Sequence, residues 1–322
     1  MSKSGSFDRD MNYIGDRITT DGTEWPVEAG KYRLVVAHAC PWANRAWITH
    51  RVLGLDGAMS VAVAGPLHDP SSWNFHLDSD GLDPVLGVHK LQEAFFNRYP
   101  DYPRGITVPA VVDIDSVSVV TNDFPVIEQD LSTEWSAFHR DGAPDLWPGD
   151  KIDEMEEVMD QIFHDVNNGV YKSGFASSQA AHEEAYDALF VRLDALEERL
   201  STQRFLMGDS ITQADIRLWP TLIRFDAVYH NHFKCNRNKI AEMPALWAYT
   251  RDLFQTPGFG DTIDFPNIKA HYYEVHTGIN PTGITPKGPD LSGLSTPHGR
   301  EALSDRPFGE GTPPTVGLPV GN

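Results

Sequence analysis

A short apolar run that ends in a cysteine and a proline constrains the fold of this chain more than any other feature. Residues 32–37 read Tyr-Arg-Leu-Val-Val-Ala, and residues 42–55 place apolar side chains at helical spacing. Between them lies His38-Ala39-Cys40-Pro41. Proline is favoured in the first turn of a helix, where its missing N–H would have no partner in any case. The sequence therefore predicts a strand, a tight loop and a helix, with Cys40 at or beside the helix N-terminus.

The remainder of the first 140 residues completes an α/β pattern. Further strand candidates are residues 60–64, 108–113 and 117–120. The last two are separated by turn residues, which predicts a hairpin. A helical stretch at 84–98 and a long polar loop around Trp73 precede that hairpin. A βαβ unit followed by a hairpin, with Cys40 at the first junction, is the organisation of a thioredoxin-type domain, which we expect at residues 1–140 with an N-terminal extension.

From residue 145 onward the pattern is helical. Residues 151–166 and 181–200 each place apolar side chains on one face. Thr212 and Asp215 have the spacing of a capping box, and further helices are expected to about Tyr229 and over residues 245–255. We therefore expect an all-helical domain at residues 141–280. Residues 281–322 are rich in Pro and Gly and should form an extended arm.

Charge and composition exclude several functions. The chain carries 26 Lys+Arg against 46 Asp+Glu, a formal charge of −20, which would repel nucleic acid and anionic membranes. The first thirty residues have no apolar run typical of a secretory signal, and no stretch approaches the ~20 apolar residues that span a bilayer. Two cysteines make no disulfide framework. We expect a folded, soluble, cytoplasmic protein with no nucleic-acid or membrane partner.

Cys40 is a candidate nucleophile. A helix N-terminus carries unpaired N–H groups and about half a positive charge, which favours thiolate over thiol. Three residues on, Ala43 stands where a two-cysteine redox motif has its second thiol, so a thiolate here must release its partner to an external thiol. The alternative is that Cys40 is a small buried hydrophobe. Cys235 lies near His230 and His232, and cysteine and histidine are the residues that bind zinc. The sequence has no second group of such residues to complete a site, so we expect no metal.

Several longer motifs carry a family resemblance. They are Cys40-Pro41-Trp42-Ala43, residues 167–176, 212–218, 224–229, 232–236 and 271–273, and Ile279-Asn280-Pro281. Together they resemble the glutathionyl-hydroquinone reductases, the Xi class of the glutathione transferase superfamily. The similarity runs from about Phe7 to Pro289, and motifs of this length and order are specific.

The resemblance implies a fold, an activity and an assembly. The fold is an α/β thioredoxin-like N-terminal domain followed by an all-α glutathione-transferase domain, in a homodimer. The activity is removal of glutathione from an aromatic hydroquinone conjugate. A cysteine attacks the conjugate sulfur, free hydroquinone leaves, and a second glutathione reduces the mixed disulfide. A lone cysteine at a helix N-terminus can perform this chemistry.

The resemblance also implies roles for single residues. Cys40 is the nucleophile. Trp73 matches the tryptophan that packs on the bound tripeptide, although such an aromatic could simply fill the core. Val108 precedes the family's cis-proline, Pro109, and its backbone would pair with the cysteinyl part of the thiol cofactor.

Three tyrosines match those that surround the aromatic acceptor in the family, namely Tyr171, Tyr229 and Tyr272. Neutral phenols are hydrogen-bond donors that can stabilise phenolate character on a departing hydroquinone. Each tyrosine taken alone could instead be a core residue with a satisfied hydroxyl.

Two departures from the family pattern concern the thiol. The family holds the γ-glutamyl end with an acid followed by serine, whereas this chain has Asp123 followed by Phe124. Arg104 lies about one residue from the place of a family arginine clamp. These departures leave glutathione and another low-molecular-weight thiol, for instance the sugar-linked mycothiol, as alternatives. Backbone N–H groups at a helix start could still hold a glutathione carboxylate.

Two competing functions remain open at this point. A conjugating transferase would activate a thiol for attack on electrophiles, but such enzymes generally have Ser or Tyr beside the thiol sulfur. A non-catalytic binding protein could also use this fold, since fold alone does not imply activity.

Overall fold

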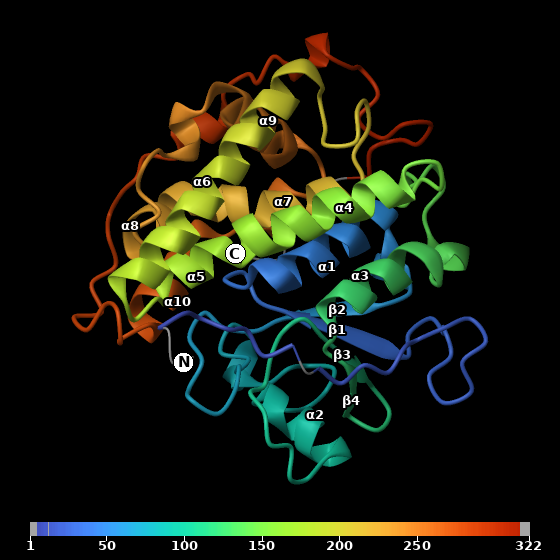
Figure 1. Cartoon of the computed structure of the whole chain (residues 1–322). Helices are drawn as coiled ribbons and strands as arrows, with labels where there is room; N and C mark the ends of the chain where they lie inside the picture. The colour runs from blue at the N-terminus through green and yellow to red at the C-terminus, as the bar shows by residue number, and fades with distance from the viewer. Residues whose placement is uncertain (1–4, 12, 316–322) are drawn as a thin grey trace.

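A four-stranded mixed sheet forms the core of the N-terminal half of the protein. We describe residues 5–11 and 13–315 in a computed structural model (Figure 1). The strands are β1 (Tyr32–Val36), β2 (Ser60–Val63), β3 (Ala110–Asp113) and β4 (Ser118–Thr121), in the order β2-β1-β3-β4. Strands β1 and β2 are parallel, and β3 is antiparallel to both β1 and β4. The predicted βαβ unit and hairpin are confirmed.

Helices cover both faces of this sheet. Helices α1 (Pro41–Leu53) and α3 (Phe124–Thr133) lie on the face toward the helical half, and α2 (Leu91–Arg98) lies on the other (Figure 1). All of β1 is buried because both of its faces are covered. Helix α1 ends where Gly54 adopts a left-handed conformation with φ 73°. A helix start at Phe124 was expected, and α3 begins there with Pro125 in its first turn, although its length was not predicted.

The structure corrects two boundaries in this half. The helix predicted over residues 84–98 begins only at Leu91. The Asp83 carboxylate accepts the N–H groups of Val85 and Leu86 instead, and this turn competes with helix. Strand β4 begins at Ser118 because Val117 belongs to the turn, with φ 48°.

The second half is helical, as predicted. It contains α4 (Ile152–Ile162), α5 (Gly169–Gly174), α6 (Gln179–Thr202), α7 (Gln213–Arg224), α8 (His230–His232), α9 (Pro244–Gln255) and α10 (Phe265–Val275). The predicted capping box of Thr212 and Asp215 opens α7. Helices α5 and α10 were not predicted. None of the described helices is long and apolar enough to cross a membrane.

Both ends of the described chain pack against the rest of the molecule. After α10 the chain forms short 3-10 turns, and the Arg300 guanidinium donates to the carbonyls of Leu200, Gln203 and Arg204. The N-terminal segment, residues 5–11 and 13–16, bonds to both halves: Gly5 accepts from the Ser177 N–H, and the Ile14 N–H donates to Asn122. Residues 1–4 and 316–322 of the expected domain and arm lie outside the described residues.

Candidate active site

Cys40 lies where the sequence places it, at the N-cap of α1. Its Sγ accepts a hydrogen bond from the Ala43 N–H at 3.4 Å. The thiol also donates to the Val108 carbonyl at 3.2 Å, and the Val108–Pro109 peptide bond is cis. The backbone ahead of β3 is therefore held directly beside the sulfur, as a peptide-like ligand requires.

The protonation of Cys40 differs from what its N-cap position predicts. Burial raises the pKa of the Cys40 thiol, while the N–H groups of Ala43 and Trp42 and the guanidinium groups of Arg224 and Arg9 lower it. Burial outweighs the donors and the cations, so the pKa of the Cys40 thiol lies above its ordinary value, which argues against the favoured thiolate expected from the N-cap position. The thiol proton is instead bonded to Val108.

Arg224 connects the Cys40 loop to the helical half. From the last turn of α7, its guanidinium donates to the His38 carbonyl at 2.6 Å, the Asn44 side chain at 3.0 Å and the Pro220 carbonyl at 2.8 Å. Because Arg224 is fully buried, these bonds fix both ends of the loop that carries the cysteine. The sequence analysis assigned no role to this residue, although it begins the 224–229 motif.

The three predicted tyrosines converge on one point. Tyr171 comes from α5, Tyr229 from the π-helical turn Phe225–Tyr229, and Tyr272 from α10. The Tyr272 hydroxyl lies 2.6 Å from that of Tyr171 and 3.0 Å from that of Tyr229. Burial raises the pKa of all three phenols, so they remain protonated donors at neutral pH. The Tyr171 ring lies 6.4 Å from that of Trp42, two residues beyond Cys40, so the cluster faces the start of α1.

Trp73 is packed between histidines. Its ring is nearly parallel to that of His271 on α10, with centroids 4.9 Å apart, and the His68 ring meets it edge-on. The Nδ1 of His271 lies 2.8 Å from the Pro66 carbonyl oxygen. Burial lowers the pKa of His271 to about 4, so its ring stacks as a neutral group. The sequence analysis missed His271, whose signal was its place beside Tyr272 in the 271–273 motif.

The residues expected to hold the γ-glutamyl end differ in their environments. Arg104 is exposed and forms an ion pair with Asp10 at 2.6 Å. Asp123 is half-buried ahead of α3, and burial raises the pKa of its carboxyl. The Phe124 side chain belongs to the core, with its ring 4.6 Å from that of Trp42. Phe124 can therefore offer a ligand only its backbone.

The N-terminal segment brings an unpredicted cation to the site. The guanidinium carbon of Arg9 lies 4.5 Å from the centre of the Trp42 ring and 4.8 Å from that of Tyr171. Its Nε donates to the Asn168 side chain at 2.7 Å. The polar segment around Arg9 has no periodicity, so only the tertiary structure shows that it reaches the tyrosines.

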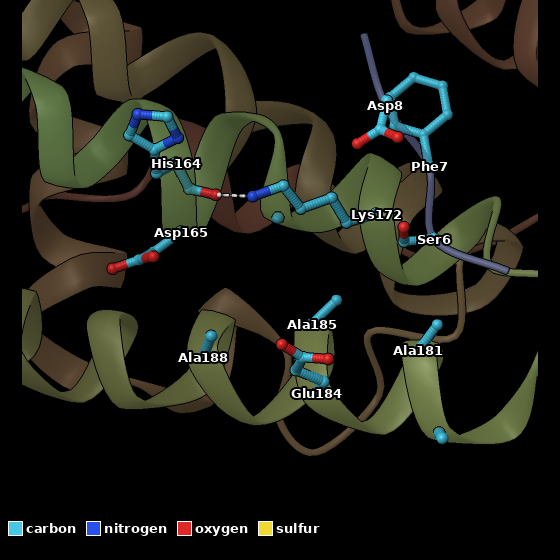
Figure 2. A pocket seen from close by; sticks show the side chains of 12 residues that line it. Ser6, Phe7, Asp8, His164, Asp165, Lys172, Ala181, Glu184, Ala185 and Ala188 are labelled. Atoms are coloured by element: carbon cyan, nitrogen blue, oxygen red, sulfur yellow. Dashed lines mark hydrogen bonds between the residues drawn. The ribbon is translucent and has the colours of Figure 1, made fainter. Parts of the chain in front are cut away.

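A separate groove runs along the outside of the N-terminal segment. It has a volume of about 580 Å³, and Figure 2 shows the carboxylates of Asp8, Asp165 and Glu184 around it. The Lys172 ammonium at its edge donates to the His164 carbonyl at 3.2 Å. Phe7 separates this groove from the Tyr171 ring, 6.4 Å away. An acidic groove would repel an anionic tripeptide, so we do not assign it to the thiol.

The second cysteine has a different environment. Cys235 is fully buried, and burial raises the pKa of its thiol to about 12. Within residues 5–11 and 13–315 no group of three or more His, Cys, Asp or Glu side chains is arranged to hold a metal ion.

The class of the protein follows from these features. A thioredoxin-like unit with a cysteine at the N-cap of its first helix, joined to an all-helical unit that supplies a cluster of tyrosines, defines the glutathione transferase fold. The family profile "Glutathione S-transferase, C-terminal domain" matches residues 179–252. The predicted fold class is confirmed.

Comparison with known proteins identifies the family more narrowly. The chain is 37% identical over 309 residues to the glutathionyl-hydroquinone reductase YqjG of Escherichia coli, covering 93% of this chain and 94% of that protein. A glutathione transferase crystal structure from Gordonia bronchialis is 60% identical, with TM-score 0.94 over 95% of this chain and 96% of that one. The glutathione-bound structure of YqjG is 36% identical, with TM-score 0.85 over 92% and 98%. The chain belongs to the glutathionyl-hydroquinone reductase family, the Xi class of the glutathione transferases.

Proposed function

We propose that this protein is a thiol-dependent reductase that removes glutathione from S-conjugated hydroquinones through a mixed disulfide on Cys40. The observation that carries the proposal is the position of Cys40 between the α1 N-terminus and the Val108 backbone, with Trp42, two residues further on, 6.4 Å from the Tyr171 ring. Its relatives include reductases of glutathionyl-hydroquinones. Ala43, in place of a second cysteine, leaves an external thiol as the resolving group.

The reaction balances in two steps. Cys40 loses its thiol proton to solvent, and the carbon that bears the sulfur takes the proton of a ring hydroxyl. The Cys40 thiolate then attacks the sulfur that joins glutathione to the ring, forming a sulfur–sulfur bond and breaking the carbon–sulfur bond. The electron pair of that bond leaves the ring as a phenolate, which takes a proton from solvent and departs as free hydroquinone. The thiolate of a second glutathione then attacks the mixed disulfide and releases glutathione disulfide. The ring is reduced by two electrons, and the two glutathione sulfurs are oxidised.

The residues divide into two groups in this proposal. For the thiol, the Val108 backbone ahead of Pro109 pairs with the cysteinyl part, and Trp73 packs on the tripeptide. The γ-glutamyl end is bound by Asp123 and the Phe124 N–H. Arg104 joins them once it has released Asp10. For the ring, Tyr171, Tyr229 and Tyr272 form the wall that donates to hydroquinone oxygens.

The identity of the thiol is the open part of the proposal. Glutathione is supported by the glutathione-bound relative. The buried Phe124 ring, in place of a hydroxyl, favours a test of a second thiol such as mycothiol. A carboxyl with a raised pKa at Asp123 can bond to a sugar hydroxyl as well as to an ammonium group.

The assembly, compartment and domain limits are part of the same proposal. We infer a homodimer in the cytoplasm, with a thiol-binding domain at residues 1–140, a helical acceptor domain at 141–280 and an arm beyond them. Both cysteines are unbridged, in keeping with a reducing compartment. Light scattering of the purified protein measures the oligomeric state.

Intact mass spectrometry tests the central step. The protein is incubated with glutathione disulfide or with mycothiol disulfide, and adducts are located by peptide mapping. We expect one adduct, on Cys40, with the physiological thiol. Turnover of a glutathionyl-hydroquinone should be lost in Cys40→Ser and retained in the matched control Cys235→Ser. Retained turnover in Cys40→Ser would refute the mixed disulfide.

A further inference from the structure

Arg9 has a donor group that nothing in the described structure uses. Its Nη2 is buried and makes no hydrogen bond, while Nε donates to Asn168. Arg9 also forms no ion pair with a described carboxylate, although the chain carries a net charge of −20. Leaving a buried charged donor unsatisfied is costly, so this geometry favours an acceptor supplied from outside.

The position of Arg9 indicates what that acceptor is. Its guanidinium lies against the faces of Trp42 and Tyr171, with Phe7 at 5.6 Å on the same segment. Trp42 is two residues beyond the Cys40 sulfur in α1, and Tyr171 belongs to the tyrosine cluster. Aromatic faces hold a planar cation without neutralising it. The open N–H groups therefore lie between the nucleophile's helix and the wall of the acceptor pocket.

The other two cations near the Cys40 helix, Arg224 and Arg45, face oxygens of the protein itself. Both Nη groups of Arg224 donate to protein oxygens. Arg45 faces the Glu128 carboxylate at 3.9 Å. The three tyrosines are neutral donors because burial raises the pKa of each. Of these cations, Arg9 lies over the Tyr171 ring and has an unbonded terminal nitrogen. The Nε atoms of Arg224 and Arg45 are also unbonded, but their guanidinium groups face protein oxygens.

We propose that Arg9 binds the hydroquinone half of the conjugate, its Nη2 donating to the ring oxygen that becomes negative as the carbon–sulfur bond breaks. The inference rests on the function proposed above. The carbon that bears the sulfur takes a proton before the bond breaks, so the electron pair released by the carbon–sulfur bond enters the π system and places negative charge on an oxygen ortho or para to that carbon. A fixed cation at this oxygen stabilises the transition state more than the neutral ground state. The favoured substrates are conjugates of phenols with such an oxygen.

Two substrates separate this role from a structural one. The first is a glutathionyl-hydroquinone. The second is the mixed disulfide of glutathione and mercaptoethanol, which needs Cys40 but has no ring. For Arg9→Met we expect kcat/KM to fall roughly 10- to 100-fold with the aromatic conjugate and to change less than about 3-fold with the disulfide. Arg9→Lys should recover part of the loss, and the exposed Arg306→Met is the matched control.

The outcomes are distinct. An unchanged kcat/KM of Arg9→Met with the conjugate overturns the inference, and so does an equal loss with both substrates, which would mean that Arg9 only supports Trp42 and Cys40. A wild-type protein that reduces the disulfide but not the conjugate overturns the proposed function instead.

A binding measurement tests Arg9 without turnover. Para-nitrophenol changes its absorbance when it ionises, so the pKa of the bound phenol can be titrated spectroscopically. We expect a lower pKa for the phenol bound to wild type than for the phenol bound to Arg9→Met. Equal values, or a phenol that does not bind to the wild type, overturn the inference. Arg9→Lys serves as the second variant if Arg9→Met does not fold.

Discussion

The hydroxyl of Tyr171 on α5 lies 2.6 Å from the hydroxyl of Tyr272 on α10. Tyr229 adds a second bond to Tyr272 at 3.0 Å, so three hydroxyl groups share two hydrogen bonds. Each phenol carries one hydroxyl proton, and the two hydrogen bonds use two of the three protons. One O–H donor therefore remains for a ligand oxygen. This cluster can bind a phenolic ring without first breaking a bond within the protein.

Removal of the central hydroxyl should affect the aromatic substrate selectively. In Tyr272→Phe, Tyr171 and Tyr229 lose their shared partner, and the orientation of the remaining donors is lost. We expect kcat with a glutathionyl-hydroquinone to fall roughly 10- to 100-fold, with little change for an aliphatic glutathione mixed disulfide. The matched control is Tyr273→Phe, whose hydroxyl accepts from Asn231 outside the cluster. Equal losses in both variants would argue against an acceptor role.

Alkylation of Cys40 should follow the raised pKa of its thiol. Burial raises this pKa above the ordinary value, so the reactive thiolate forms only as the pH rises past it. We expect the iodoacetamide rate at Cys40 to increase through the alkaline range, with a midpoint above that of a free thiol. Mass spectrometry distinguishes Cys40 from the buried Cys235. A midpoint at or below neutral pH would contradict the burial argument.

Two buried histidines should make the protein sensitive to acid. Burial lowers the pKa of His232 and of His271 to about 4, from about 6.5 in an unfolded chain. The unfolded state binds more protons between these values, so stability is full above about pH 6.5 and declines as the pH falls toward 4. Each histidine should cost roughly 2 kcal/mol by pH 5. Urea unfolding at several pH values measures this, and His271→Gln should flatten the dependence.

Loss of Arg224 should destabilise the fold and loosen the Cys40 loop. Arg224→Met leaves the His38 and Pro220 carbonyls and the Asn44 amide oxygen without their donor in a buried position. We expect the free energy of unfolding to fall by about 3 kcal/mol. The exposed Arg306, paired with Glu310, provides the control Arg306→Met, which should change stability by less than about 0.5 kcal/mol. A similar small change in Arg224→Met would contradict this role.

Restoring the family's hydroxyl at position 124 should cost stability. The Phe124 ring contacts the rings of Trp42, Tyr13 and Phe163, so Phe124→Ser creates a cavity among them. We expect a loss of about 3 kcal/mol in the free energy of unfolding. If glutathione is the thiol, its Kd should nevertheless decrease, which isothermal titration at low temperature can measure. An unchanged Kd would indicate that the backbone N–H alone binds the carboxylate, and an increase would contradict the expected role of the hydroxyl.

Local signals account for the parts of the fold that were predicted correctly. Cys40 falls at an N-cap because Pro41 and the apolar spacing after it act within one helical turn. The capping box of Thr212 and Asp215 is likewise a contact between residues three apart. Helix α2 began later than predicted because the Asp83 turn competes with helix at the same residues. These elements could be predicted from the sequence because the interactions that stabilise them join residues only a few positions apart.

The sequence by itself determined the strand–cysteine–helix junction, the helical second half and the three tyrosines worth examining. Only the tertiary structure decided that Tyr171, Tyr229 and Tyr272 meet, that Arg9 lies against Trp42 while Arg224 bonds to the Cys40 loop, and that burial raises the pKa of the thiol. The physical reason is the range of the forces. Helix caps and periodic stripes depend on neighbours within a few residues, whereas burial and charge at Cys40 depend on groups that lie far away along the chain and close only in space.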